Sequence, residues 1–166
     1  EDNEALRMAA QNGHLEVLRF LTDKFELTTE DVRADDNEAL RYAACNGHVE
    51  VLRFLTDKFE LTIDDARDCD NAALRWAASN GHVEVLRFLT DKFEFINEDV
   101  KAEDNVALRM AAQKGHLEVL RFLTDKFELT TEDARDENNW ALRRAASNGH
   151  VEVVEFFENE WGLTLS

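Results

Sequence analysis

The sequence predicts an all-α repeat solenoid of five stacked helix-pair units, each with a short third helix. The string that begins at Ala5 returns every 34 residues, at Ala39, Ala73 and Ala107, and in altered form at Ala141. The 166 residues contain no proline, and apolar residues recur with the helical period of 3.6. A unit of this size cannot bury its own apolar face, so neighbouring units are expected to stack into one continuous core.

The repeat divides the whole chain without leaving a linker. The expected units are residues 2–35, 36–69, 70–103, 104–137 and 138–166. An array of this kind needs roughly three units for stability, and this chain has more. We therefore expect a single repeat domain over residues 1–166.

The first two helices of each unit are predicted by their ends and by their apolar spacing. In the first unit, Asp2 and Asn3 are natural caps for a helix from about Glu4 to Asn12, and Gly13 suits a left-handed helix end. The second helix, from about His14 to Phe25, spreads its apolar residues over a broad face. That breadth suits a helix held between two neighbouring units.

A third, shorter helix is predicted after Thr28. Thr28 stands three residues before Asp31, which is the spacing of a capping box. The same spacing recurs in Thr62 with Asp65 and in Thr130 with Asp133. In the third unit Ile96 replaces the threonine, and Asn97 is expected to cap the helix one residue later.

Charge and cysteine content narrow the partners and the compartment. The net charge is −17, and acidic residues outnumber basic ones in every unit. Such a surface repels phosphate backbones and anionic lipid, so we expect a basic protein or peptide as partner, and no nucleic acid or membrane. The alternative is that the charge only keeps the chain soluble. Cys45 and Cys69 fall at different repeat positions, which predicts free thiols in the reducing cytoplasm.

Catalysis and metal binding are not expected, because nearly every ionisable residue recurs in every unit. An active site needs one special constellation, whereas stacking needs the same residue each time. Equivalent histidines in stacked helices should lie about 8–10 Å apart, too far to share one ion. We therefore predict no enzyme, no cofactor and no metal, and a structural role for the recurring histidines: His14, His48, His82, His116 and His150.

The segment from Ala9 to Val17, which reads A-A-Q-N-G-H-L-E-V, resembles the ankyrin repeat. The resemblance extends over all five units. It implies antiparallel helix pairs in a curved solenoid that binds proteins through its concave side. Two segments depart from the family: Glu4 to Arg7 replaces its T-P-L-H opening, and Phe25 to Thr28 replaces the part that builds a β-hairpin. The fold is therefore expected to be ankyrin-like and nearly all-α.

The candidate binding residues are those at which the units differ, on one face of the first helix. One position reads Met8, Tyr42, Trp76, Met110 and Arg144 along the array. The position four residues earlier reads Glu4, Glu38, Ala72, Val106 and Trp140, and the position three residues later reads Gln11, Cys45, Ser79, Gln113 and Ser147. Tyr, Trp, Met and Arg are enriched in protein interfaces. The alternative is that these side chains are half-buried filler between units.

These observations predict a protein-protein interaction module that binds a partner through the concave first-helix surface. The alternatives are a structural or engineered scaffold without a natural ligand, favoured by the near-identity of the units, and the interaction segment of a larger protein. One set of arginines recurs and should satisfy neighbouring carbonyls or carboxylates: Arg7, Arg41, Arg75, Arg109 and Arg143.

The two ends of the array are predicted to differ. Terminal units of solenoids normally need a polar outer face. The last unit has Glu155 where earlier units have arginine, and it adds Glu158 and Glu160. The first unit keeps the apolar residues of an internal one. We therefore expect a capped C-terminal end and an uncapped N-terminal unit through which the chain could self-associate.

Overall fold

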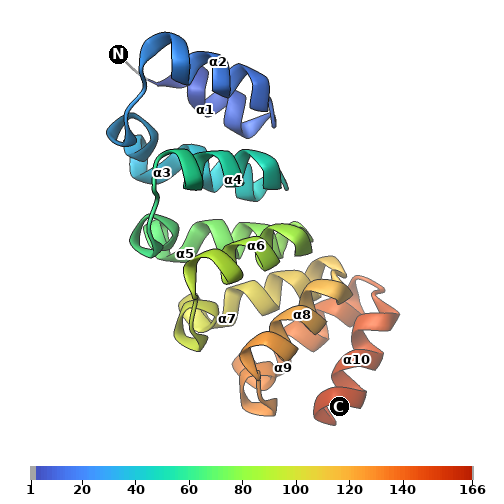
Figure 1. Ribbon diagram of the computed structural model, residues 1–166. Coiled ribbons are helices and arrows are strands. Elements are labelled where there is room, and N and C mark those ends of the chain that lie inside the picture. The colour runs from blue at the N-terminus through green and yellow to red at the C-terminus, as the bar shows by residue number, and fades with distance from the viewer. Residues whose placement is uncertain (1–2, 166) are drawn as a thin grey trace.

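The computed structural model describes residues 3–165, without the side chains of residues 136 and 137, and it is helical throughout. Its helices are α1 (Glu4–Gln11), α2 (Leu15–Phe25), α3 (Thr29–Cys45), α4 (Val49–Lys58), α5 (Ile63–Ser79), α6 (Val83–Phe93), α7 (Asn97–Lys114), α8 (Leu117–Phe127), α9 (Thr131–Ser147) and α10 (Val151–Trp161). No strand occurs in the described part of the chain. The prediction of an all-α solenoid is confirmed: helix pairs stack one after another along the array (Figure 1).

Each helix pair is closed by a tight turn at a glycine. In the first pair, Gly13 has a φ of 72°, and the N–H of His14 donates to the carbonyl of Ala9 at 2.9 Å. This is the pattern of a helix C-cap with a left-handed glycine. The N–H groups of His48, His82, His116 and His150 make the same bond in their own turns. The expected helix end at this glycine is confirmed.

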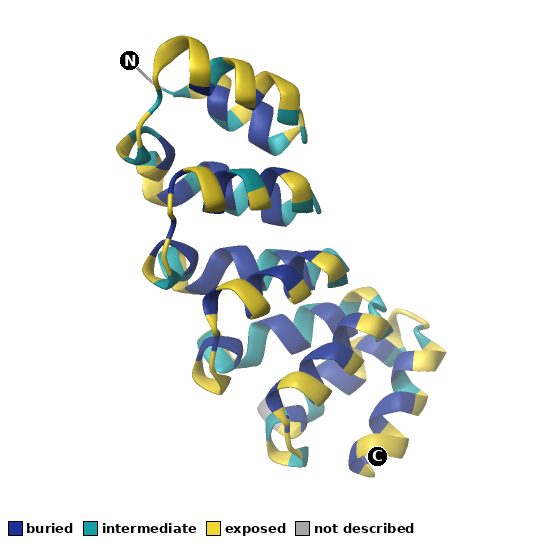
Figure 2. Ribbon diagram, viewed as in Figure 1, coloured by how far each residue is buried: buried dark blue, intermediate teal, exposed yellow. Residues whose placement is uncertain are grey.

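The apolar core runs through the whole array between the two layers of helices. Leu18, Leu52, Leu86 and Leu120 hold the same repeat position and are fully buried. The odd-numbered helices α3 to α9 pack closely against one another, whereas the even-numbered helices touch each other at few points. Buried positions consequently face inward on both layers, and the outward side of α2 is the most exposed (Figure 2).

The segment after the second helix of the first unit begins with the predicted capping box and then turns in a way that was not predicted. Thr28 caps α3, and the carboxylate of Asp31 accepts from the Thr28 N–H at 2.8 Å. Asp35, Asp36 and Asn37 then follow in the left-handed region, with φ values of 54°, 56° and 56°. The asparagine expected to cap the next helix is therefore part of a left-handed turn, which re-aims the chain into the first helix of the next unit.

Arginines of the first helices hold these left-handed turns. Arg41 donates through Nε to the carbonyl of Asp36 at 2.8 Å and through Nη2 to that of Asp35 at 2.9 Å. Arg75 donates to the carbonyl of Cys69 at 2.8 Å. Arg7 forms an ion pair with Asp35. The structure thus places these three arginines in the predicted role, and it adds that their targets are the residues with strained backbone.

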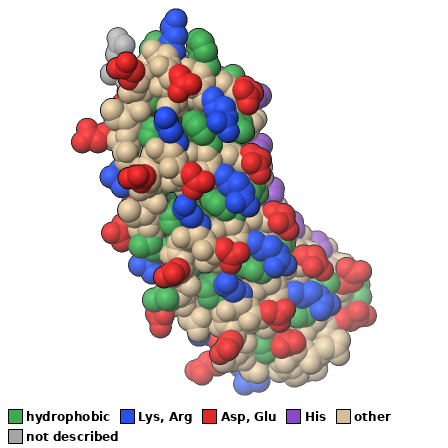
Figure 3. Space-filling view, in the orientation of Figure 1, with side chains coloured by type: hydrophobic (Ala, Val, Ile, Leu, Met, Phe, Trp, Pro, Cys, Tyr) green, Lys and Arg blue, Asp and Glu red, His purple; other side chains and the backbone are tan. Residues whose placement is uncertain are grey.

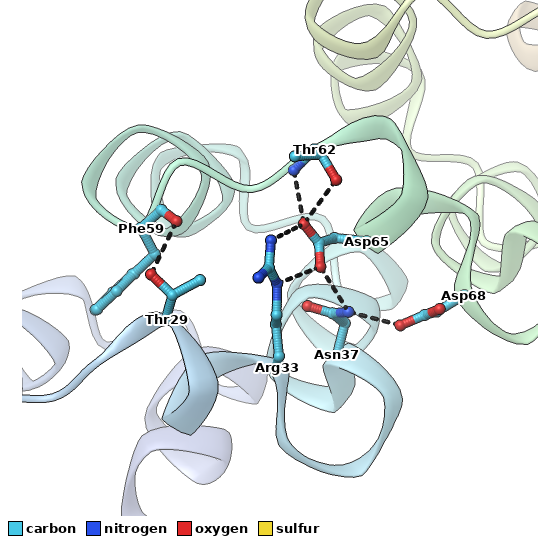
Figure 4. A network of polar contacts seen from close by, with 7 residues as sticks. All are labelled: Thr29, Arg33, Asn37, Phe59, Thr62, Asp65 and Asp68. Atoms are coloured by element: carbon cyan, nitrogen blue, oxygen red, sulfur yellow. Dashed lines mark hydrogen bonds and ion pairs between the residues drawn. The ribbon is translucent and has the colours of Figure 1, made fainter.

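A polar network joins each unit to the next, as Figure 4 shows for the first and second units. Arg33 binds both carboxylate oxygens of Asp65, at 2.6 and 2.9 Å. The side-chain amide of Asn37 donates to Asp65 at 3.3 Å and to Asp68 at 2.6 Å. Asp65 also accepts from the N–H of Thr62 at 2.7 Å, so one carboxylate caps its own helix and fastens the preceding unit.

The pKa of the Asp65 carboxyl group records this double role. Burial opposes its ionisation, but the hydrogen bonds from Arg33 and Thr62 outweigh burial and lower the pKa. The pKa of Asp133 is lowered in the same way, against burial, by Lys101 and Thr130. Both carboxylates are therefore charged members of the inter-unit contact at neutral pH.

Two of the expected helix caps are not used. Asn3 precedes α1, but its side chain donates to Asp31 at 3.2 Å instead of accepting from its own helix. The expected cap at Asp2 lies outside the described residues. In the third unit α7 begins at Asn97, so Ile96 occupies the cap position that was assigned to Asn97. The Ile96 N–H still donates to Asp99 at 2.9 Å, which preserves the half of the capping box that needs no hydroxyl.

Candidate protein-interaction surface

One set of positions at which the units differ forms a row on the odd-numbered helices. We call Met8, Tyr42, Trp76, Met110 and Arg144 the variable column. Met8 and Arg144, at its two ends, are exposed, and the three residues between them are half-buried. Because the odd-numbered helices pack directly against each other, these side chains are neighbours across unit boundaries.

The centre of the variable column is an aromatic stack. The rings of Tyr42 and Trp76 lie with their centroids 6.0 Å apart and their planes at 29°. The guanidinium of Arg41 lies 5.5 Å from the Trp76 ring centroid, within cation-π range. Since Arg41 is itself bonded to backbone carbonyls, the stack is supported from one side by a fixed group. The rings are thereby held in place before any partner arrives.

A second aromatic group lies toward the C-terminal end. The Trp140 ring lies under two guanidinium groups, that of Arg109 at 4.7 Å and that of Arg144 at 5.3 Å. Trp140, Arg144 and Ser147 line a hollow on this surface together with Arg143. This end of the row therefore places two guanidinium groups, the half-buried Arg109 and the exposed Arg144, against one indole, whereas Trp76 has a single guanidinium beside it.

The other predicted positions divide into accessible and inaccessible members. Glu4 is exposed, Glu38 and Val106 are half-buried, and Ala72 is buried. Glu38 is already paired with Arg7 at 3.1 Å. At the third position Ser147 is exposed, and the remaining members are half-buried: Gln11, Cys45, Ser79 and Gln113. The accessible part of the predicted patch is therefore narrower in the third unit, where Ala72 is buried and only Trp76 and Ser79 remain accessible.

The histidines fix the backbone beneath this surface. Nε2 of His48, His82 and His150 lies 3.0 Å from the carbonyl oxygen of Gln11, Cys45 and Gln113 respectively, each in the preceding unit. His116 makes the equivalent bond to Ser79, and burial lowers its pKa. For these four histidines the geometry agrees with the predicted structural role, whereas His14 is exposed in the first unit. Among the described residues, no group of His, Cys, Asp or Glu side chains could hold a metal ion.

The repeated geometry has a counterpart in sequence families. A model of ankyrin repeats, three copies long, matches residues 1–65 and 74–161. The chain belongs to the ankyrin-repeat family. No curated protein matches it significantly over any part of its length. The resemblance inferred from the Asn-Gly-His turn is therefore confirmed.

Membership of the ankyrin family gives the class of function. Ankyrin repeats are in general protein-protein interaction modules and are typically not catalytic. Between residues 3 and 165, no helix is both long and apolar enough to cross a bilayer.

The sequence reasoning missed the junction contact of Asp65, which it assigned only to a capping box. The signal for it was present, because Arg33 and Arg67 recur one unit apart, at a fixed distance before the next aspartate.

Proposed function

We propose that this ankyrin-repeat domain binds a protein partner on the variable column, on the concave side of the array. The observation that carries the proposal is the half-buried stack of Tyr42 on Trp76, in the middle of a row of first-helix positions at which the near-identical units differ. Aromatic anchors at the centre of a patch commonly supply most of the binding energy. Met110 and Arg144 continue the surface toward the C-terminus.

The concave position is supported by the packing of the two layers. In a curved stack, the layer with the shorter path has its helices closer together. The odd-numbered helices, which carry the variable column, are the closely packed layer, and the even-numbered helices are the spread layer. The even-numbered layer instead shows regular rows of acidic and basic side chains (Figure 3).

A basic protein or peptide is the partner that the charge favours. The net charge of −17 would steer a cationic partner toward the array and would repel nucleic acid and anionic membrane. Within the proposal, the five units are residues 2–35, 36–69, 70–103, 104–137 and 138–166, and the first four end in a short third helix in place of a hairpin. The expected third helix of the last unit is not formed, because residues 162–165 after α10 are not helical. Cys45 and Cys69 are both free, which suits a module working in the reducing cytoplasm.

A scaffold without a natural ligand is the second candidate. It is favoured by the segment VLRFLTDKFE, which recurs unchanged from Val17, Val51, Val85 and Val119. Such a scaffold would have no reason to hold an aromatic stack on one face. The interaction segment of a larger protein is a third reading, and it assigns the same role to the variable column.

The test uses the immobilised chain to capture proteins from a cell lysate, with a matched pair of variants. Trp76→Ala removes the proposed anchor, and Ile96→Ala removes an exposed apolar side chain from the loop before α7. We expect proteins that are retained by the wild type and by Ile96→Ala but are weakened at least tenfold by Trp76→Ala. Capture should also fall as salt is raised.

Melting temperatures of the same variants separate binding from stability. If Trp76→Ala lowers the melting temperature strongly and leaves capture unchanged, Trp76 is packing filler and the proposal is wrong. If the wild type retains nothing that Trp76→Ala loses, the scaffold reading is favoured instead.

A further inference from the structure

A hollow of 630 Å³, which we call the α8–α10 groove, lies between two helices of the even-numbered layer. Buried Phe156 and half-buried Leu117 form its apolar part. The guanidinium of Arg121 lies 5.5 Å from the Phe156 ring centroid. Figure 3 shows acidic side chains gathered at this end of the array. Four exposed carboxylates line the groove: Glu118, Glu152, Glu155 and Glu160.

The same hollow occurs at an internal junction, between α4 and α6. It has a volume of 410 Å³, and Arg53 and Phe88 line it at the repeat positions of Arg121 and Phe156. Two more units follow this junction, and the hollow remains open. A further repeat stacked on α10 would therefore leave the α8–α10 groove accessible.

The two hollows differ in charge at the positions that they share. Arg87 and Lys92 line the hollow between α4 and α6, and the equivalent residues of the α8–α10 groove are Glu155 and Glu160. Of the six shared lining positions, three are basic and two acidic in the internal hollow, whereas one is basic and three are acidic in the α8–α10 groove. The groove has thus become negative while its phenylalanine is kept.

The internal junctions show what fills the place of Glu160 elsewhere. The ammonium of Lys92 lies 2.7 Å from the carboxylate of Asp57, in the preceding unit. Lys126 makes the same contact, at 3.2 Å, with the aspartate of its own preceding unit. At the last junction the aspartate position is held by Asp125 and the lysine position by Glu160. The place of an ammonium is therefore bordered here by two carboxylates, and a cation from outside would complete the contact.

Glu160 stands where local stability favours a cation. It lies in the last turn of α10, and the helix dipole favours positive charge at that end. Its repulsion from Asp125 is a second cost. Solvation of the outer end of the array does not account for it, because the lysine at its position reaches back to the preceding unit. Residues that oppose local stability are expected at functional sites.

We propose that the α8–α10 groove binds a basic segment of a partner protein. One lysine or arginine of the segment takes the place of the internal lysine, with its charge between Asp125 and Glu160 and its aliphatic stem along Phe156. A second basic side chain lies against Glu152 and Glu155. The occupant follows from charge complementarity with a place that the chain elsewhere fills with its own lysine. This second site does not rest on the variable column.

The probe is an acetylated and amidated peptide of four arginines and two leucines, followed by fluorescence anisotropy at low salt, where charge contacts are least screened. Glu155→Arg with Glu160→Lys gives the groove its internal residues and should weaken binding by about tenfold or more. Glu16→Lys with Glu26→Lys makes the same change of net charge at exposed positions of the first unit. This control should leave the dissociation constant within about twofold of the wild type.

The reverse substitution tests the groove independently of the last unit. Arg87→Glu with Lys92→Glu should create a second site between α4 and α6, so that isothermal titration calorimetry finds two peptides bound per chain instead of one. Trp76→Ala should leave peptide binding unchanged, because the variable column lies on the other layer of helices. Circular dichroism verifies that each variant folds.

Four results would overturn the proposal. The wild type does not bind the peptide, or the groove variant and its control weaken binding equally, in which case the acidic surface as a whole attracts the peptide. The stoichiometry of the reverse variant stays at one, or Trp76→Ala abolishes binding. Spermine, a polyamine of similar charge, is the competitor. If it displaces the labelled peptide as well as the unlabelled peptide does, the occupant is a polyamine and the proposal is wrong.

Discussion

The internal junctions and the two ends of the array place the same residue types in different surroundings. Asp31 and Asp65 hold equivalent positions in the capping boxes of α3 and α5. Only Asp65 also accepts hydrogen bonds from the Arg33 guanidinium. Gly81 and Gly149 adopt the same left-handed conformation, yet only Gly81 lies against a histidine of a following unit. Repetition of sequence thus reproduces the local structure of a unit, whereas a neighbouring unit decides what each residue contributes to stability.

The largest effect is expected at the glycine turn. Gly81→Ala places a methyl group in a left-handed backbone, which costs about 1–2 kcal/mol, and puts it 2.7 Å from Nδ1 of His116. His116 must then move and lose its bond to the Ser79 carbonyl, for a total of about 3 kcal/mol. Denaturant unfolding measures this loss.

Gly149→Ala is the matched control for this substitution. Gly149 has a φ of 77°, close to the 81° of Gly81, but an added methyl group there meets nothing within 4 Å. The free energy of unfolding should therefore fall only by the cost of placing an alanine in a left-handed backbone, about 1–2 kcal/mol. Equal losses in the two variants would show that the histidine contact contributes nothing to the junction.

Much of this architecture was accessible from the sequence, because its signals are local. Period, helix ends and the Thr28 capping box all follow from residues within a few positions of one another. The left-handed run Asp35-Asp36-Asn37 did not follow, since consecutive left-handed residues are locally unfavourable and are held here by Arg41 and by the next unit. A clue was the recurring asparagine, a residue type that tolerates this conformation best outside glycine.

The candidate surface was predicted as a set of positions but not as a structure. Comparing units identified the variable column, because side chains free of the stacking requirement can differ. It could not tell that Tyr42 stacks on Trp76, or that Ala72 is buried, since both depend on how far apart neighbouring helices lie. The distances between helices of neighbouring units are set by packing over the whole junction. They cannot be inferred from the sequence of a single repeat.

An intermediate effect is expected at the inter-unit carboxylate. Asp65→Ala removes the cap on α5, the acceptor for Arg33 and one acceptor for Asn37, so we expect a loss of about 2 kcal/mol. Asp31→Ala removes the equivalent cap without an arginine partner and should cost about 1 kcal/mol. Urea titration of both variants measures the difference, and a smaller loss for Asp65→Ala would contradict the assigned network.

The smallest effect is the pH dependence that His116 contributes. Burial, assisted by the nearby charge of Lys114, lowers the pKa of His116 below its usual value of about 6.5. As the pH falls, this histidine is therefore protonated in the unfolded chain before it is protonated in the folded one. The contribution of His116 to the free energy of unfolding is present above about pH 7 and is lost as the pH falls below about 6.5. The lowered pKa of Asp65 acts with the same sign, but only below about pH 4. His116→Gln, which keeps an N–H donor at similar reach, should reduce the fall in melting temperature between pH 7.5 and 5.5. The control variant is His14→Gln, at the same repeat position in the first unit, where the side chain is exposed. The pH dependence of the melting temperature is compared between the two variants. If the two variants change the pH slope equally, burial at the junction is not the cause.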